Sequence, residues 1–71
     1  MTGELMDFEI VFDREDDGRW IAEIESLPGV LAYGTTQVEA QSKVEALALR
    51  VVADQIEAGR IALDAVKFAV A

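Results

Sequence analysis

From residue 6 the chain alternates apolar and polar positions with a period of two, the pattern of a strand with one buried face. Residues 14–18 are polar and end in glycine, and residues 19–25 then alternate again. Two alternating segments around a short glycine-containing loop predict a β-hairpin. We expect residues 1–5, which carry no such pattern, to fray. The inward positions are Met6, Phe8, Ile10, Phe12, Trp20, Ala22 and Ile24, and the outward positions of the first strand are Asp7, Glu9, Val11 and Asp13.

Two further strands are predicted later in the chain. Residues 26–29 interrupt the second strand, because Pro28 has no N–H and Gly29 accepts a positive φ. Residues 30–33 then form a short third strand, and the alternation over residues 64–70 indicates a last one.

A helix is predicted between the third and the last strand. Thr36 followed by Glu39 has the spacing of a capping box, in which each side chain satisfies a backbone N–H of the other. We expect the helix to run to about Ala58, with Gly59 as the residue that terminates it. Its sheet-facing stripe comprises Ala40, Val44, Leu47, Ala48 and Val51.

The order of these elements, β-β-β-α-β, defines the expected fold. A helical crossover joins the third strand to the fourth, so the fourth strand should lie parallel to a strand of the antiparallel meander, and the first strand is the best neighbour. The sequence therefore predicts a single α+β domain over residues 1–71, with two layers and one long helix on one face of the sheet.

The helix carries more apolar surface than one sheet face requires. Its apolar arc covers roughly 200°, against about 100° for a helix that covers one face. A chain of 71 residues without cysteine also has a small core, for which association between subunits is a common support. We therefore predict a homodimer or higher homo-oligomer, with Leu49, Val52 and Ile56 at the contact.

Composition excludes several functional classes. The chain has no Cys and no His, which removes thiol and imidazole catalysis and the usual zinc and copper ligands. We expect no enzymatic activity, catalytic residue, metal or cofactor. The net charge of −8 argues against direct binding of nucleic acid. No apolar stretch approaches the roughly 20 residues of a membrane span, and we expect no membrane contact and a cytoplasmic location.

The acidic loop of the hairpin invites comparison with a calcium site. Residues 13–18 place acids at the first, third and fifth positions and glycine at the sixth, as in an EF-hand. The position of the required bidentate Glu is occupied by Ile24, and the flanking segments alternate like strands, so we interpret the loop as a solvated turn.

Negative charge is concentrated in the first third of the chain. Residues 1–25 hold nine acids and two bases, whereas residues 26–71 hold five acids and four bases. With Phe12 placed opposite Trp20, Glu9 would face Glu23 and Asp7 would face Glu25, and such like-charge pairs destabilise a sheet. Two interpretations remain open: a solvated face that maintains solubility, and a docking surface for a cationic protein. The docking residues would be Asp7, Glu9, Val11, Glu15, Asp16, Asp17, Ile21, Glu23 and Glu25.

Several motifs resemble the HicB-like antitoxin family. Residues 17–24, with the sequence Asp-Gly-Arg-Trp-Ile-Ala-Glu-Ile, precede Leu-Pro-Gly-Val at residues 27–30 and Gly-Thr-Thr at residues 34–36. The similarity covers about residues 6–58. It implies a partial RNase H-like fold without the RNase H active site, in the antitoxin of a type II toxin–antitoxin pair.

The resemblance also implies a partner. Such an antitoxin binds a small, basic, mRNA-cleaving toxin of the HicA-like type and masks its RNA-binding surface or its catalytic His. Many relatives add a C-terminal DNA-binding segment, and because this sequence stops at Ala71 we expect no such segment here. The competing hypothesis is a HicB-like module without a toxin, which would act as an oligomeric regulatory subunit or respond to a small molecule.

Overall fold

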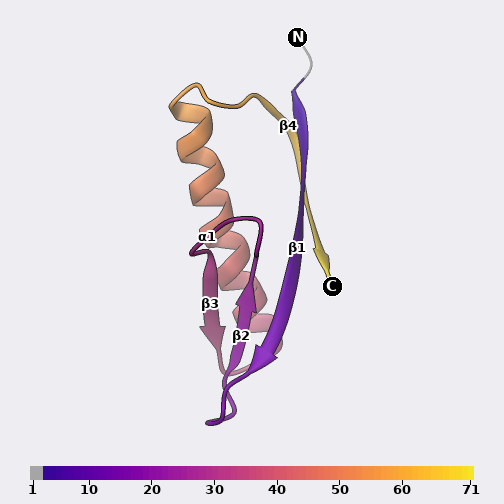
Figure 1. Cartoon of the computed structure of the whole chain (residues 1–71), viewed down its shortest axis with the longest axis vertical. Helices are drawn as coiled ribbons and strands as arrows, with labels where there is room; N and C mark the ends of the chain where they lie inside the picture. The colour runs from indigo at the N-terminus through magenta and orange to yellow at the C-terminus, as the bar shows by residue number, and fades with distance from the viewer. Residues whose placement is uncertain (1–2) are drawn as a thin grey trace.

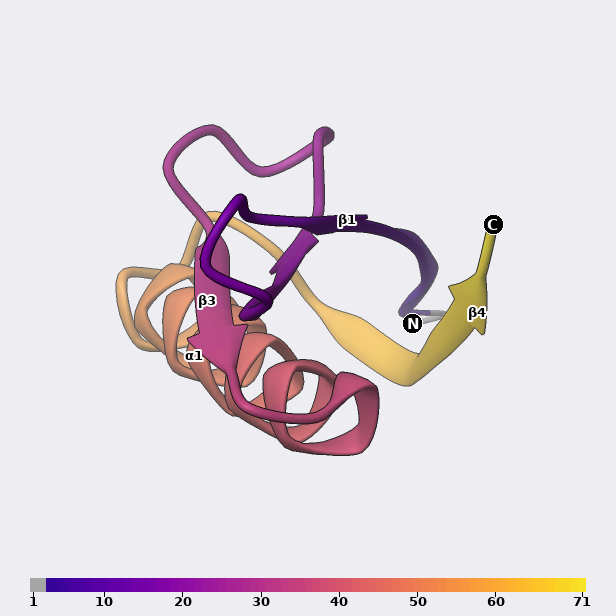
Figure 2. The same ribbon diagram turned by 90° about the horizontal axis from the view of Figure 1, so that it is seen from below.

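The N-terminal alternation forms one long strand, and the later segments form three shorter strands and a helix. The computed structural model describes residues 3–71. The sheet and helix form two layers, with α1 alongside β3 and β4 at the far end of the sheet (Figures 1 and 2). This arrangement confirms the predicted α+β class and element order. The elements are β1 (Glu4–Arg14), β2 (Trp20–Glu23), β3 (Leu31–Gly34), α1 (Gln37–Glu57) and β4 (Leu63–Val70).

β1 is shared between two ladders that are offset along its length. The strand order is β3-β2-β1-β4, with β2 antiparallel to both β1 and β3, and β4 parallel to β1 as predicted. Residues 4–10 of β1 are in register with β4, whereas residues 11–14 are in register with β2. Because the two neighbours contact different halves of β1, the molecule is long, with extents of 47 × 20 × 16 Å.

The predicted fraying of the N-terminus is wrong for Glu4 and Leu5. Both residues belong to β1, and the Glu4 N–H donates to the carbonyl of Ala62 at 2.8 Å. The Gly3 N–H donates to the Asp64 carboxylate at 3.2 Å. The acceptors lie in β4 and in the residue that precedes it, a partner that the local pattern of residues 1–5 does not reveal. Residues 1 and 2 lie outside the described residues.

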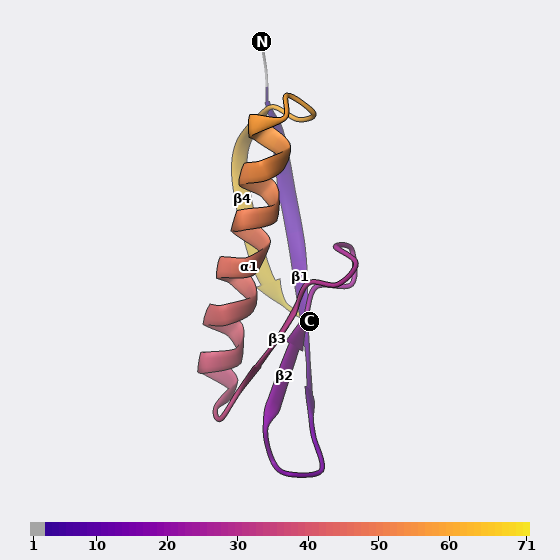
Figure 3. The ribbon, with the colours of Figure 1, turned by 90° about the vertical axis from the view of Figure 1, so that its left-hand side faces the viewer.

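The connection between β2 and β3 projects away from α1 (Figures 2 and 3). It contains a turn in which the Val30 N–H donates to the Leu27 carbonyl at 3.0 Å, with Pro28 and Gly29 between them. Gly29 has φ +81°, the left-handed value that the third position of a type II turn requires. The Pro-Gly pair therefore acts as the predicted strand break.

The ends of α1 follow their sequence signals with one difference. The Thr36 side chain accepts the Glu39 N–H at 3.1 Å, as predicted. The Glu39 carboxylate, however, accepts the N–H of Thr35 at 3.3 Å, one residue earlier than a capping box requires. At the other end Ala58 is the C-cap, and Gly59 has φ +71°, which terminates the helix as expected.

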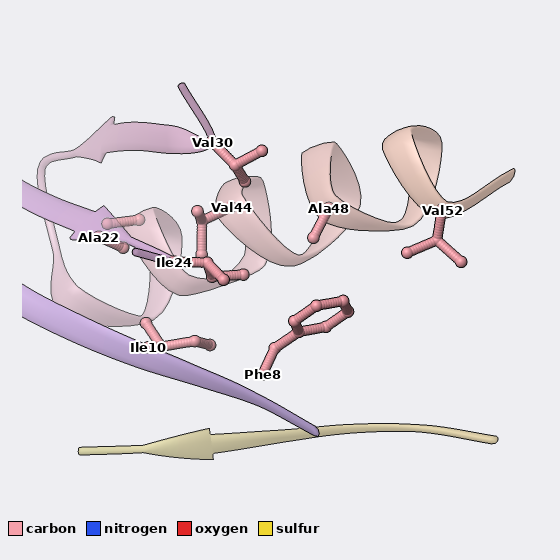
Figure 4. Packing of buried hydrophobic residues seen from close by; sticks show 9 residues of the cluster. Phe8, Ile10, Ala22, Ile24, Val30, Val44, Ala48 and Val52 are labelled. Atoms are coloured by element: carbon pink, nitrogen blue, oxygen red, sulfur yellow. The ribbon is translucent and has the colours of Figure 1, made fainter. Parts of the chain in front are cut away.

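The core lies between α1 and the inward faces of β1 and β2. Helix residues spaced by four point into it, and Phe8 points from β1 toward Ala48 and Val52 (Figure 4). The inward assignment of Phe8 is confirmed by its burial, whereas Trp20 is half-buried at the end of the sheet. The buried apolar residues are Phe8, Ile10, Ala22, Ile24, Val30, Ala40, Val44, Ala48 and Val52.

The helix stripe differs from the predicted one at Val52. This side chain is 3% exposed and belongs to the core, so its assignment to a subunit contact is wrong. A spacing of four residues advances about 40° around a helix, so the buried line from Ala40 to Val52 turns by about 120°. This rotation turns the second half of α1 toward Phe8 on β1, a contact that one straight stripe does not predict.

Candidate functional site: the acidic face of the sheet

One face of the sheet points away from α1 and presents acids around apolar side chains. Phe12 lies opposite the buried Ala22 and therefore faces the core, so Val11 and Asp13 face outward. In register, Val11 lies opposite Glu23 and Asp13 lies opposite Ile21. We call this surface the acidic face and define it by Asp7, Glu9, Val11, Asp13, Ile21 and Glu23.

On the acidic face, an apolar residue of one strand lies opposite an acid of the other in the ladder between β1 and β2. β3 extends both of its rows, because Glu23 lies opposite Leu31 and Ile21 lies opposite Tyr33. Leu31 and Tyr33 are 36% and 38% exposed, whereas Val11 and Ile21 are half-buried by their neighbours. The result is a small apolar centre bounded by carboxylates, which matches the composition of the predicted docking surface.

The predicted hairpin register is wrong by two residues. Arg14, not Phe12, is the partner of Trp20, so Glu9 does not face Glu23 and Asp7 does not face Glu25. Phe12 and Trp20 instead meet diagonally, with ring centroids 6.4 Å apart in an edge-to-face arrangement. The expected destabilising pairs of like charge are therefore absent from the ladder between β1 and β2.

The geometry of the hairpin loop explains this register. The Gly18 N–H donates to the Glu15 carbonyl at 2.9 Å, and the Glu15 N–H donates to the Arg19 carbonyl at 2.8 Å. Gly18 has φ +89°. This is a three-residue loop with a turn followed by a left-handed residue. It aligns residue 15 with residue 19, and the ladder continues from that pair.

The acids of the hairpin loop differ in how available their carboxylates are for binding another protein. The Asp17 carboxylate accepts the N–H of Arg19 at 3.0 Å and its Nε at 2.8 Å. The hydrogen bond from the backbone of Arg19 is the main cause that lowers the pKa of Asp17. Asp17 therefore stabilises the turn, with its charge paired to Arg19. Asp16 is exposed and Glu15 is half-buried, and both lie beyond the end of the ladder.

Two arginine side chains stack on aromatic rings at the end of the sheet beside the hairpin loop. Arg14 lies over the Trp20 ring at 4.8 Å from its centroid, and Arg19 lies over the Tyr33 ring at the same distance. Cations stacked on aromatic faces are held close to the sheet. Arg19 thus limits the negative potential at one margin of the acidic face.

A second cation, Lys67, lies at the opposite margin and was not predicted to be there. The parallel ladder places Asp7 opposite Lys67 and Glu9 opposite Ala69. A hollow of about 340 Å³ lies here, lined by Asp7, Phe8, Glu9, Lys67 and Ala69. The small Ala69 side chain leaves room beside Glu9. The alternation of residues 64–70 placed Lys67 on this side of β4, but its position beside Asp7 required the register.

Among the described residues, no ion pair neutralises a carboxylate of the acidic face. Within residues 3–71, salt bridges join Arg19 to Asp17 at 2.8 Å and Lys43 to Glu39 at 3.2 Å. Neither pair includes a residue of the acidic face, and its four acids are all exposed. Asp13 accepts the Arg14 N–H at 2.8 Å, a bond that leaves its charge in place. Alternation already placed Asp13 outward, although the predicted docking set did not include it.

The remaining predicted site residues fall outside the acidic face. Glu25 is exposed in the connection that follows β2. Leu49 and Ile56 are 46% and 44% exposed on α1, so two of the three predicted subunit-contact residues are accessible. They lie on the helix layer, remote from the outward side of the sheet (Figure 3).

Comparison with known proteins assigns no family to this chain. No protein-family model, curated protein or solved structure matches it. Among the described residues, no helix is both long and apolar enough to cross a membrane. The functional inference therefore depends on the geometry and charge of the acidic face.

Proposed function

We propose that this protein is an antitoxin-like inhibitor that binds a small, basic, mRNA-cleaving toxin through its acidic face. The observation that carries the proposal is the set of exposed carboxylates around Val11 and Ile21 that have no ion-pair partner within residues 3–71. A cationic surface that binds RNA phosphates would find a similar charge pattern here. Bound in this way, the protein would block access of RNA to the toxin.

Binding would proceed in two stages with different residues. The net charge of −8 attracts a cationic protein over a distance of about one Debye length, which is ~8 Å at physiological ionic strength. At contact, Val11 and Ile21 with Leu31 and Tyr33 would exclude water, and the neighbouring carboxylates would pair with Arg or Lys of the toxin.

The length of the sheet limits which acids touch a partner at the same time. Asp16 lies about 30 Å from Asp7 along the chain, at ~3.3 Å per residue of extended strand. A small toxin centred on Val11 and Ile21 would contact Glu9, Asp13 and Glu23. The loop acids Glu15 and Asp16 would then act mainly through long-range attraction.

The resemblance to HicB-like antitoxins in the hairpin, the Leu-Pro-Gly turn and the Gly-Thr-Thr helix start supports the same function. The three motifs lie in β2, in the turn before β3 and at the entry to α1, which together position one half of the acidic face. A toxin that cleaves mRNA acts where mRNA is translated, so the proposal includes a cytoplasmic location.

The proposal predicts that a short reading frame for a basic protein lies next to the gene, and the test uses the product of that reading frame. We expect that protein to arrest growth when expressed alone, and this chain to restore growth when co-expressed. Binding measured by calorimetry should be weakened at least tenfold by Glu23→Lys. The matched control is Glu57→Lys, which makes the same charge change at an exposed position of α1 and should have a much smaller effect.

Two results would contradict the proposal. Equal weakening by Glu23→Lys and Glu57→Lys would show that net charge alone, without the acidic face, determines binding. An association rate that is insensitive to salt between low and physiological ionic strength would exclude electrostatic attraction as the first stage.

A further inference from the structure

β4 is an edge strand with one open side. It is last in the strand order β3-β2-β1-β4, and within residues 3–71 it pairs with β1 alone. It is eight residues long and contains neither Pro nor Gly. An edge strand of this length offers its backbone groups to another chain unless something covers or interrupts it. We infer that β4 pairs antiparallel with β4 of a second copy, which joins two sheets into one.

The ladder with β1 identifies the backbone groups that would form this contact. The Ala71 N–H donates to the Ile10 carbonyl at 2.9 Å, so odd-numbered residues at this end of β4 bond to β1. Successive residues of a strand direct their N–H and C=O groups to opposite sides. The groups of Val66, Phe68 and Val70 therefore point to the open side.

The opposite edge of the sheet is protected, which makes the open side of β4 distinctive. β3 has four residues, and its last residue, Gly34, is buried against the start of α1. Short edge strands covered by another element are a common protection against pairing. β4 has eight residues and no such cover in the described part of the chain.

The charge of β4 favours a second copy of this chain as the partner of its open edge. A chain with a net charge of −8 repels its own copies, so a contact between identical surfaces requires a balanced region. β4 carries one acid, Asp64, and one base, Lys67, whereas β1 carries four acids and one base. Antiparallel pairing of β4 with itself is also self-complementary, as a twofold interface requires.

Side chains next to the open edge have room for a partner. Val66 and Phe68 face the helix side of the sheet but are half-buried, and Val70 is 53% exposed. The copy of β4 would bring its own Val66, Phe68 and Val70 beside them and cover this apolar surface.

The symmetry of the pairing has a consequence for the acidic face. Antiparallel strands related by a twofold axis require that axis to be perpendicular to the sheet, which keeps equivalent faces on one side. The dimer would therefore present both acidic faces on one side and both helices on the other. This inference is independent of the proposed function, because it concerns another edge and another partner.

The first measurement is mass by sedimentation over a wide concentration range, combined with hydrogen exchange of individual amides in the same samples. We expect twice the chain mass of 7.7 kDa at high concentration. The amides of Val66, Phe68 and Val70 should be protected in the dimer and should exchange rapidly after dilution to monomer. Those of Lys67 and Ala69, which face β1, should stay protected in both states.

The second measurement compares two valine-to-proline variants. Val66→Pro removes a donor at the open edge, and we expect a folded monomer. Val38→Pro makes the same change in the first turn of α1, where the N–H has no partner within the helix, and should leave the dimer intact. Circular dichroism verifies folding, and the hydrogen-exchange result stands by itself if Val66→Pro does not fold.

The inference is overturned by a monomer at all concentrations. It is also overturned by a dimer in which Val66, Phe68 and Val70 exchange rapidly, or by a folded Val66→Pro that remains dimeric. In those two dimeric cases, Ala53→Glu tests a contact through α1, because Ala53 is exposed between Leu49 and Ile56.

Discussion

Gly34 and Ala40 approach each other so closely that a side chain at residue 34 has no space. A Cβ at Gly34 would lie 2.5 Å from the backbone nitrogen of Ala40 and 3.0 Å from the Thr36 carbonyl oxygen. The last residue of β3 and the first turn of α1 are thus in backbone contact. This contact holds the start of α1 close to the end of β3.

The first prediction concerns this contact. Gly34→Ala should destabilise the protein by about 2–3 kcal/mol, because the obstructing atoms are backbone atoms that cannot rotate away. Gly29→Ala is the comparison, since its Cβ would meet nothing within 4 Å but its φ is +81°. We expect a loss of about 1 kcal/mol there. Urea denaturation measures both, and a smaller loss at Gly34 than at Gly29 would contradict the packing.

The second prediction concerns the core stripe of α1. Val44 is fully buried, so Val44→Ala should lower the free energy of unfolding by about 2 kcal/mol, through lost burial and the cavity that remains. Val38→Ala is the matched control, because Val38 is 74% exposed, and its effect should stay within about 0.5 kcal/mol. Similar losses in the two variants would show that this stripe does not form the helix contact.

The third prediction concerns pH. The hydrogen bond from the Thr35 backbone, with Lys43 as the second cause, lowers the pKa of Glu39 from its ordinary value of 4.5. A carboxyl whose pKa is lower in the folded state adds stability above its unfolded pKa and loses it as the pH falls through the folded value. Glu39→Gln should therefore reduce the midpoint temperature at neutral pH and have a diminishing effect below about pH 4.

Thermal melts of both proteins from about pH 7 to about pH 3 would measure this dependence. Glu57→Gln is the control, because it also removes one charge from an exposed position of α1. A constant difference between wild type and Glu39→Gln over the whole range would contradict the role assigned to the Glu39 carboxylate.

The fourth prediction tests whether the acids of the acidic face stabilise the fold. Glu9→Gln should leave stability unchanged or raise it by up to about 0.5 kcal/mol, because Glu9 is exposed and makes no ion pair within residues 3–71. Added salt should reduce the difference from wild type by screening. A loss of 1 kcal/mol or more would show that Glu9 has a structural partner and would weaken its assignment to binding.

The fifth prediction separates attraction from contact in toxin binding. Asp16→Lys, at the end of the hairpin, should slow association and reduce its salt dependence while changing the dissociation rate little. Glu23→Lys, beside Val11, should mainly raise the dissociation rate, by about tenfold or more. Stopped-flow kinetics measure both rates. The reverse result, in which Asp16→Lys raises the dissociation rate and Glu23→Lys mainly slows association, would place the contact at the loop.

The acidic face contains one wrong prediction, the hairpin register, and one neighbour that was not predicted, Lys67. A strand that alternates apolar and polar residues keeps the same buried side when its register moves by two residues, so alternation could not select the partner of Val11. The Gly18 turn selected it, through the hydrogen bond that the Glu15 N–H donates to the Arg19 carbonyl. The position of Lys67 beside Asp7 likewise depends on the register of two strands that are far apart in the sequence.

Local patterns in the sequence were sufficient for the strands, the limits of α1 and the sorting of Asp7, Glu9 and Val11 to the outward side. These features depend on periodicity, capping and turn chemistry, which act over a few residues. The hairpin register followed from the local turn at Gly18, which alternation does not reveal. Tertiary structure alone decided the burial of Val52, the pairing of Glu4 with the β4 segment and the open edge of β4. Each of these features depends on contacts between segments that are far apart in the sequence. The stabilisation from such a contact belongs to both segments together, so the local pattern of either segment does not reveal it.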